Sequence, residues 1–144
     1  MKAETILIPD PSPRKYTGPY ETRCLLKAQV DTPEGIVNVL VSHFGLLPDE
    51  HENAVAAAMA HLEAERFVLM GDFNMTPDNP ILAPIFGALQ DSAVHFPAPR
   101  LSFPSDNPTI KIDYLFTSAD VKVLSADIPD WVVSDHRPHL AVIE

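Results

Sequence analysis

One stretch of the chain, residues 67 to 74, reads Phe67-Val68-Leu69-Met70-Gly71-Asp72-Phe73-Asn74. Its first four residues are apolar, and because the run is short and is followed by turn-forming residues, it predicts a buried β-strand. Side chains alternate along an extended chain, so Asp72 and Asn74 point to the same side. A carboxylate and a carboxamide at a strand end can bind a hard cation and a phosphate oxygen. Taken alone, the pattern is at least as typical of a polar turn.

Two further polar clusters follow apolar segments downstream. Residues 110–116 alternate as a strand, with Asp113 where an apolar residue would be expected. Ser134-Asp135-His136 then precedes a last predicted strand at residues 139–143, and such an Asp–His pair is typical of a carboxylate that orients or charges an imidazole. Each cluster alone is also explained by a surface carboxylate or a loop histidine. Together, three polar clusters at strand ends predict one site at one sheet edge.

These segments resemble the motifs of the endonuclease/exonuclease/phosphatase superfamily of metal-dependent phosphohydrolases. The matching segments, in the family's order and at about its spacing, are Val41-Ser42-His43-Phe44, Gly71-Asp72-Phe73-Asn74, Lys111-Ile112-Asp113-Tyr114-Leu115-Phe116 and Ser134-Asp135-His136-Arg137-Pro138. The resemblance implies an α/β fold with one mixed, largely antiparallel sheet and helices on one face, equivalent to half of the family's two-sheet α/β sandwich. Residues 1–144 are expected to be the C-terminal half of such a domain. The family's first asparagine and its metal-binding glutamate are expected upstream of Met1.

The resemblance also implies roles for the acidic residues. Asp72 would deprotonate a water aimed at phosphorus, which is the role of a general base. Asn74 would hold that water or a non-bridging phosphate oxygen. Asp135, together with Asp72, would contact a Mg²⁺ or Mn²⁺ ion, which takes only one or two protein carboxylates.

By the same resemblance, the histidines would contact the phosphoryl group. His136 would donate to its oxygens as negative charge develops, and Asp113 would fix the His136 ring and keep it protonated. His43 would be a second phosphate contact, although a strand-end histidine bonded to a backbone carbonyl also explains it. We expect the remaining histidines to be surface or structural residues: His51, His61, His95 and His139.

Charge and composition restrict the substrate and the location. The net charge of −10, from 20 acidic and 10 basic residues, argues against tight binding of duplex DNA, which needs a basic surface. It favours a small phosphoester or a lipid head group over a nucleic acid as the phosphate-containing substrate. The single cysteine, Cys24, excludes an intrachain disulfide and is expected to be buried in a reduced protein. With no signal peptide or membrane span in this sequence, we expect a cytoplasmic protein.

The apolar patterns predict several strands but only two helices. Helices are predicted at 49–65, with Asp49 and Glu52 forming a capping box, and at 80–89. Two helices cover one face of a sheet, so the other face, with alternate residues of 37–41, needs a second layer. We therefore expect a homodimer or pairing with the missing N-terminal half. The predicted strands lie at residues 5–8, 23–30, 36–42, 67–70, 110–116, 121–125 and 139–143.

Two classes of function remain open from the sequence. The first is a Mg²⁺- or Mn²⁺-dependent hydrolase of phosphoesters or phosphodiesters, such as a phosphatase, phosphodiesterase or nuclease, whose site is incomplete in this chain. The second is a non-catalytic half-module that acts by dimerisation or by pairing with another chain. Because the family's metal-binding glutamate has no replacement here, we expect the isolated chain to be weakly active or inactive.

Overall fold

The computed structural model describes residues 2–144 of the chain. Within these residues, the main sheet has six strands in the order β1-β2-β3-β4-β6-β5, and a second sheet pairs β7 with β8. The strands are β1 (Lys2–Leu7), β2 (Cys24–Thr32), β3 (Gly35–His43), β4 (Phe67–Asp72), β5 (Gln90–Asp91), β6 (Asp113–Thr117), β7 (Val123–Asp127) and β8 (Leu140–Ile143). The helices are α1 (Pro48–Ala60) and α2 (Ala83–Ala88), with two short 3-10 turns, η1 (Pro80–Leu82) and η2 (Ser92–His95).

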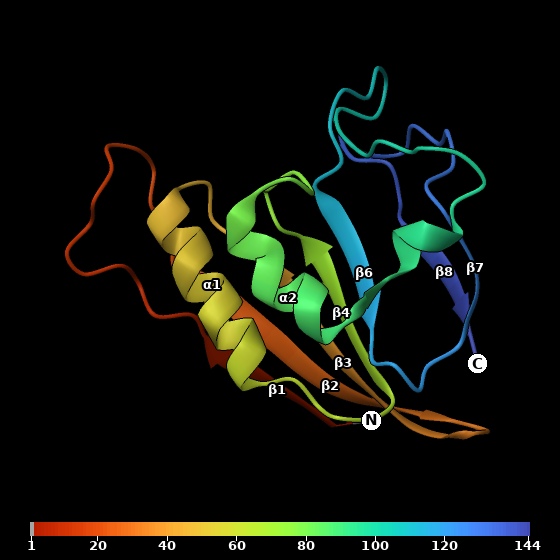
Figure 1. Cartoon of the computed structure of the whole chain (residues 1–144). Helices are drawn as coiled ribbons and strands as arrows, with labels where there is room; N and C mark the ends of the chain where they lie inside the picture. Colours follow the sequence, from red (N-terminus) through yellow and green to blue (C-terminus); the bar gives the residue numbers. More distant parts are fainter. Residues whose placement is uncertain (1) are drawn as a thin grey trace.

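The main sheet is mixed and largely antiparallel. β3 and β4 run parallel, whereas all the other neighbouring pairs in this sheet are antiparallel. A parallel pair needs a crossover connection, and α1 supplies it between β3 and β4. Figure 1 shows α1 and α2 on one face of the sheet. The predicted fold class, an α/β fold with one mixed sheet and helices on one face, is confirmed.

The hydrophobic core lies between the sheet and the two helices. Phe67 and Leu69 of β4 are fully buried in it, as the apolar run predicts. The ring of Phe73, just after β4, stacks with its centroid 5.2 Å from Tyr114 and 6.0 Å from Phe116. Stacked aromatic rings of this kind contribute beyond the area that they bury. Tyr114 and Phe116 are therefore core residues, as expected from the sequence.

The opposite face of the main sheet carries a row of apolar side chains. Leu26, Val41, Met70 and Leu115 occupy matching positions on the adjacent strands β2, β3, β4 and β6. Neither α1 nor α2 lies on this face, and Leu26 is 43% exposed. We call this row the open apolar face. The second layer predicted for it stays a prediction.

The β2 strand corrects one expectation from the sequence. Its alternating residues Cys24, Leu26, Ala28 and Val30 share one side of the strand, as predicted, but that side belongs to the open apolar face. Cys24 is consequently exposed and not buried. Alternation identifies which residues share a face, but not which of the two faces a helix covers.

Helix α1 is shorter than predicted and is capped differently. It begins at Pro48 and ends at Ala60, five residues before the predicted end. The backbone amides of Leu46 and Leu47 donate to the Glu50 carboxylate, so Glu50 caps the helix in place of the predicted pair of Asp49 and Glu52. Pro48 explains the difference, because proline favours the first helical position and so places the N-cap at Leu47, two residues before Asp49.

The C-terminal strands also differ from the prediction. β6 begins at Asp113 and not at residue 110, because Ile110 forms an isolated bridge with Phe103. β7 and β8 pair with each other in a separate small sheet and do not extend the main one. The loop that precedes β8 nevertheless reaches the edge of the main sheet where β4 ends, because His136 in this loop contacts Asp72 and Asp113.

Within residues 2–144, none of the helices has the length and apolar character needed to cross a lipid bilayer.

The parallel strands β3 and β4 approach each other very closely at Gly71. Its φ is +143°, and a Cβ atom on it would lie 1.8 Å from the carbonyl oxygen of Ser42. Only glycine adopts this conformation without strain and leaves room for the neighbouring carbonyl. Gly71 therefore permits the strand pairing that carries Asp72 to the sheet edge.

We predict that Gly71→Ala lowers the free energy of unfolding by roughly 3 kcal/mol or more, because a strained φ and an overpacked interior each cost about 1–3 kcal/mol. Urea unfolding measures the change. The matched control is Gly87→Ala on α2, where a Cβ meets nothing within 4 Å. The control variant should be as stable as the wild type or more stable, by up to about 1 kcal/mol. Equal urea midpoints of unfolding for Gly71→Ala and wild type would contradict the close approach of β3 and β4 at Gly71.

Candidate active site

The ends of three neighbouring strands bring three predicted site residues into one row. In the strand register, His43 of β3 pairs with Asp72 of β4, and Asp72 pairs with Asp113 of β6. Because β4 runs parallel to β3 and antiparallel to β6, the last residue of β4 meets the end of β3 and the start of β6. The prediction that polar clusters converge at one sheet edge is therefore confirmed for these three residues.

The loop before β8 adds His136 to this row. Its Nδ1 atom lies 2.8 Å from Oδ2 of Asp113, and its Nε2 atom lies 3.8 Å from Oδ2 of Asp72. The same Asp72 oxygen lies 3.3 Å from Nε2 of His43. One carboxylate oxygen thus faces two imidazoles, and a second carboxylate holds one of these rings from behind.

Asp72, Asp113 and His136 line a cleft of about 400 Å³, whereas His43 is not among its lining residues. Asp72 and Asp113 are mostly buried, with side chains 14% and 17% exposed, whereas His43 is 55% exposed. The floor of the cleft is apolar and includes Val41 and Met70 of the open apolar face. A larger hollow of about 550 Å³ lies at β1 and β2 and contains none of the predicted site residues.

The environment of Asp72 favours its protonated form. Burial raises the pKa of Asp72 above its usual value, and the nearby charge of Asp113 adds to the increase. The backbone amide of Asn74 donates to Oδ1 of Asp72 at 2.8 Å, which opposes the shift without cancelling it. A carboxylate whose pKa is raised in this way is a better proton acceptor than a solvated one.

Asn74 is held by the main chain. It adopts a φ of +52°, which asparagine tolerates better than most residues, and its side-chain Nδ2 donates to the carbonyl of Phe44 at 3.0 Å. This contact ties the turn after β4 to the residue after β3. The predicted contact of Asn74 with a water or a phosphate oxygen stays a prediction.

His136 is poised as a proton donor. Partial burial alone would lower the pKa of His136, but the hydrogen bond to Asp113 and the charges of Asp113 and Asp72 outweigh it and raise the pKa above its usual value. The ring of Phe103 packs against the imidazole at a centroid distance of 4.7 Å. Since Nδ1 donates to Asp113, Nε2 is the atom left to face Asp72 and the cleft.

The loop that carries His136 is fixed by a neighbouring turn. The amide of Ser105 donates to the carbonyl of Asp135 at 2.8 Å, and the amide of Arg137 donates to the carbonyl of Ser102 at 2.8 Å. The hydroxyl of Ser105 also donates to the carbonyl of Ser134. These contacts set the backbone on both sides of His136, which explains how a loop residue reaches the sheet edge.

Asp135 lies apart from the other carboxylates. Its side chain accepts a hydrogen bond from the Ser134 hydroxyl at 2.8 Å, and the residue is exposed. Among the residues that the structure describes, a group of side chains with ligand atoms within 4.8 Å of one another consists of Asp72, Asp113 and His136. Carboxylate oxygens are the ligands that Mg²⁺ and Mn²⁺ prefer, so this donor set fits a hard divalent cation. The metal contact predicted for Asp135 stays a prediction.

Sequence reasoning missed several polar residues that border the site. His139, expected to be a surface or structural residue, lines the cleft and is half-buried. Lys111 is buried beside it, and Ser92 contacts the His139 ring. Lysine in an otherwise apolar segment directly before Asp113 was a signal that could have been used. The contact between Ser92 and His139 leaves no such signal, since 47 positions separate them.

The sequence model of the Endonuclease/Exonuclease/phosphatase family matches residues 9–136 of this chain, and the chain therefore belongs to this family. The match contains His43, Asp72, Asp113 and His136, the four residues that meet at the sheet edge. A comparison with curated proteins gave no match.

Solved structures of low sequence identity share the fold. A mannosyl-6-phosphatase of Bacteroides thetaiotaomicron, Bt3783, has a TM-score of 0.81 and 16% identity, with 99% of this chain and 66% of that chain covered. The human Nocturnin catalytic domain with bound sulfate has a TM-score of 0.77 and 14% identity, with coverage of 100% and 58%. TDP2 of D. rerio with a single-stranded DNA product has a TM-score of 0.69 and 15% identity, with coverage of 100% and 67%. The chain thus spans about two thirds of their length at most.

We predict that Asp113→Asn lowers the pKa of His136, because the variant removes the charge that favours the imidazolium. Titration of His136 by NMR measures the shift, and Asp106→Asn, at an exposed loop position, is the control. The raised pKa of His136 also means that its contribution to stability is present below the usual histidine pKa and is lost as the pH rises through the folded value. The same pKa in Asp113→Asn and wild type would show that Asp113 does not charge the ring.

Proposed function

We propose that this chain carries the base and the phosphate-contacting histidines of a metal-dependent hydrolase of phosphoesters or phosphodiesters. The observation that supports the proposal most directly is the position of Oδ2 of Asp72, 3.3 Å from Nε2 of His43 and 3.8 Å from Nε2 of His136. An arrangement that combines an acceptor carboxylate with two imidazole donors suits the attack of water on a phosphate group.

In this proposal Asp72 accepts a proton from the attacking water. Its raised pKa brings the carboxylate closer to the working pH, which improves a general base. His136 donates from Nε2 to a phosphoryl oxygen, because Nδ1 is held by Asp113. The hydrogen bond to Asp113 fixes the ring and stabilises the imidazolium as negative charge develops on the phosphate. His43, which is half-exposed at the mouth of the site, makes a second phosphate contact.

A divalent cation, Mg²⁺ or Mn²⁺, is part of this proposal. Bound at such a site, the ion polarises a phosphoryl oxygen and offsets negative charge. The carboxylate of Asp72 is the protein ligand best placed for it, with Asp113 beside it. Asp135 is a further ligand by resemblance to the family. The acidic net charge of the chain is partly offset once a cation is bound.

The substrate proposed is a small phosphomonoester, a phosphodiester or a lipid head group, with nucleic acid less favoured. The net charge of −10 supports this order, because a nucleic acid is held mainly by lysine and arginine contacts with its phosphates. The solved structures of similar fold include both a sugar phosphatase and a protein with bound single-stranded DNA product, so the fold accommodates either class.

A cytoplasmic location remains a proposal based on the single cysteine.

We further propose that residues 1–144 correspond to the C-terminal half of the family's domain. Support comes from the share of the solved chains that is covered, 58–67%, and from the open apolar face. A face of this kind needs a second layer, supplied by another polypeptide segment or by a second copy of the chain. The alternative function, a non-catalytic half-module that acts by pairing, uses the same face.

The activity of the isolated chain tests the first proposal. With Mg²⁺ or Mn²⁺ and a generic phosphodiester, we predict poor turnover, because the metal lacks the family's glutamate ligand. Asp72→Asn should lower the rate of any residual turnover at least about 100-fold, since the base is lost while the shape of the side chain is kept. Asp106→Asn is the matched control and should leave the rate unchanged. Robust turnover by the isolated chain would refute the claim that its site is incomplete. Turnover that survives Asp72→Asn would refute the claim that Asp72 is the general base.

The association state tests the second proposal. At micromolar concentration we predict a homodimer by analytical ultracentrifugation, because the open apolar face is covered in such a pair. Leu26→Lys places a charge on that face, at its most exposed residue, and should shift the protein toward monomer. Leu46→Lys, at an exposed leucine before α1, is the matched control. A compact wild-type monomer that binds no hydrophobic dye would show that the face is already covered.

A further inference from the structure

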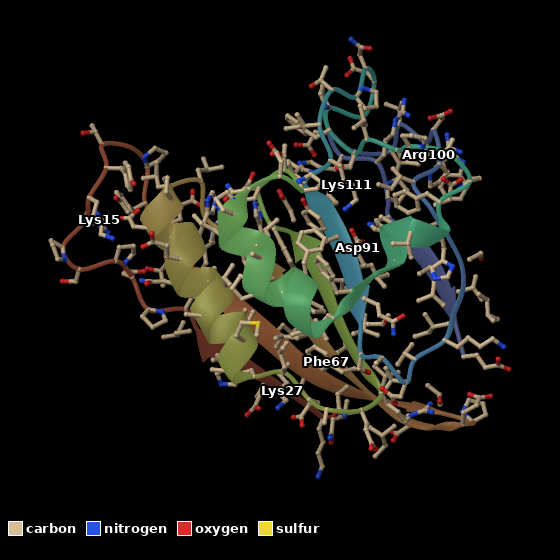
Figure 2. All side chains as sticks on the ribbon, viewed as in Figure 1. Lys15, Lys27, Phe67, Asp91, Arg100 and Lys111 are labelled. Carbon is tan, nitrogen blue, oxygen red and sulfur yellow. The ribbon has the colours of Figure 1, made fainter. Side chains whose placement is uncertain are left out.

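Beside Asp113 lies a group of buried and half-buried polar side chains that the proposed reaction does not use. Lys111, Asp91, Ser92 and His139 come from three separate segments of the chain and meet beside the start of β6. Figure 2 labels Lys111 and Asp91 close to β6. Polar groups are costly to bury unless they are paired, so their arrangement calls for a structural or functional reason.

His139 is the centre of the group. Its Nε2 atom lies 2.9 Å from the hydroxyl oxygen of Ser92, and its Nδ1 atom lies 3.3 Å from the backbone carbonyl oxygen of Asp113. A carbonyl oxygen only accepts, so Nδ1 carries the proton and donates to it. In the neutral ring Nε2 is then an acceptor, and the Ser92 hydroxyl donates to it. Each polar atom of the ring has one partner, and the partner fixes the tautomer.

The surroundings keep the His139 ring neutral. Burial is the main cause that lowers the pKa of His139, to about 4, and the positive charge of Lys111 acts in the same direction. The ammonium of Lys111 is itself enclosed, 3.5 Å from the centre of the Tyr114 ring and 3.8 Å from Oδ2 of Asp91. His139 therefore differs from His136, although only two residues lie between them: burial lowers the pKa of His139, whereas the hydrogen bond to Asp113 raises the pKa of His136.

Ser92 is held firmly enough to anchor the ring. It is fully buried, and it opens the short turn η2, whose preceding residue Asp91 accepts a hydrogen bond from the amide of Ala93 at 2.9 Å. Asp91 also pairs with Phe116 in the main sheet. The chain of contacts thus runs from the sheet through η2 to His139 at the start of β8, and back to the backbone of Asp113.

We infer that His139, anchored by Ser92, is a positioning residue that holds the backbone of Asp113 and the loop of His136 in register with each other. The inference rests on the proposed function only for its catalytic meaning, because the contacts themselves involve no substrate. Two connections meet at this point, the entry to β6 and the loop before β8. Without the His139 contact, Asp113 and His136 are aligned by their own hydrogen bond and by the contacts of both segments with Ser102 and Ser105.

The test uses the whole chain and the proton on Nδ1 of His136, observed by NMR. His139→Asn keeps a side-chain N–H close to the position of Nδ1, whereas His139→Leu has the same branched shape and no donor. In His139→Leu the exchange of the His136 proton with solvent should rise about fivefold or more, the factor that one ordinary hydrogen bond supplies. His139→Asn should retain most of the protection. Ser92→Ala, which keeps the histidine but frees its ring, should give an intermediate rise.

His95→Asn, at an exposed histidine on η2, is the matched control and should change nothing. Unchanged exchange in both His139→Leu and Ser92→Ala would overturn the inference. Equal loss of protection in His139→Asn and His139→Leu would also overturn it, since packing alone would then explain the effect. Where turnover is measurable, His139→Leu should lower kcat and leave KM unchanged. Turnover that survives Asp72→Asn refutes the proposed function. The role of His139 is then decided by the exchange of the His136 proton alone.

Discussion

The close approach of β3 and β4 at Gly71 is the constraint on which the rest of the site depends. Because this residue has no Cβ, the carbonyl of Ser42 can lie where a side chain would otherwise be. The parallel pairing then continues to the last residue of each strand and sets His43 beside Asp72. A shift of one residue would turn every side chain of β4 to the other face, so the position of the acidic row is determined by backbone packing. The chemistry at the edge is thus a consequence of how tightly two strands pack.

The polar residues around this edge fall into two groups with different environments. The first contains two carboxylates and His136, whose pKa is raised. The second contains a buried lysine, Lys111, whose pKa burial lowers to about 8, and His139, which also lines the cleft and whose pKa is lowered to about 4. Such burial is unfavourable for folding, and proteins commonly keep it at sites where function requires it. The pKa of His136 is raised and that of His139 is lowered, although only two residues lie between them, because their surroundings differ.

The sequence alone was sufficient for the fold class and for the four residues that meet at the sheet edge. Strand patterns are local, and Asp72 and Asp113 each follow or begin a recognisable apolar run. The predicted end of α1 and its predicted cap of Asp49 and Glu52 were wrong. Glu50 forms the cap, and Asp49 instead contacts Lys15 and Tyr20, which are distant in sequence. The separate β7–β8 sheet and the contact of Ser92 with His139 could not be predicted either. Both depend on tertiary packing between segments, which no short window of sequence contains.

The exposed thiol of Cys24 gives the open apolar face a property of its own. This is the single cysteine of the chain, and it shares its side of β2 with Leu26, one of the four residues that define the face. A thiol at the edge of an apolar surface is accessible to a modifying reagent when the surface is bare and shielded when another layer lies on it. The same atom is a natural attachment point for a fluorescent or spin label. The chain thus carries one built-in chemical reporter, placed on the face whose covering distinguishes a half-domain from a complete one.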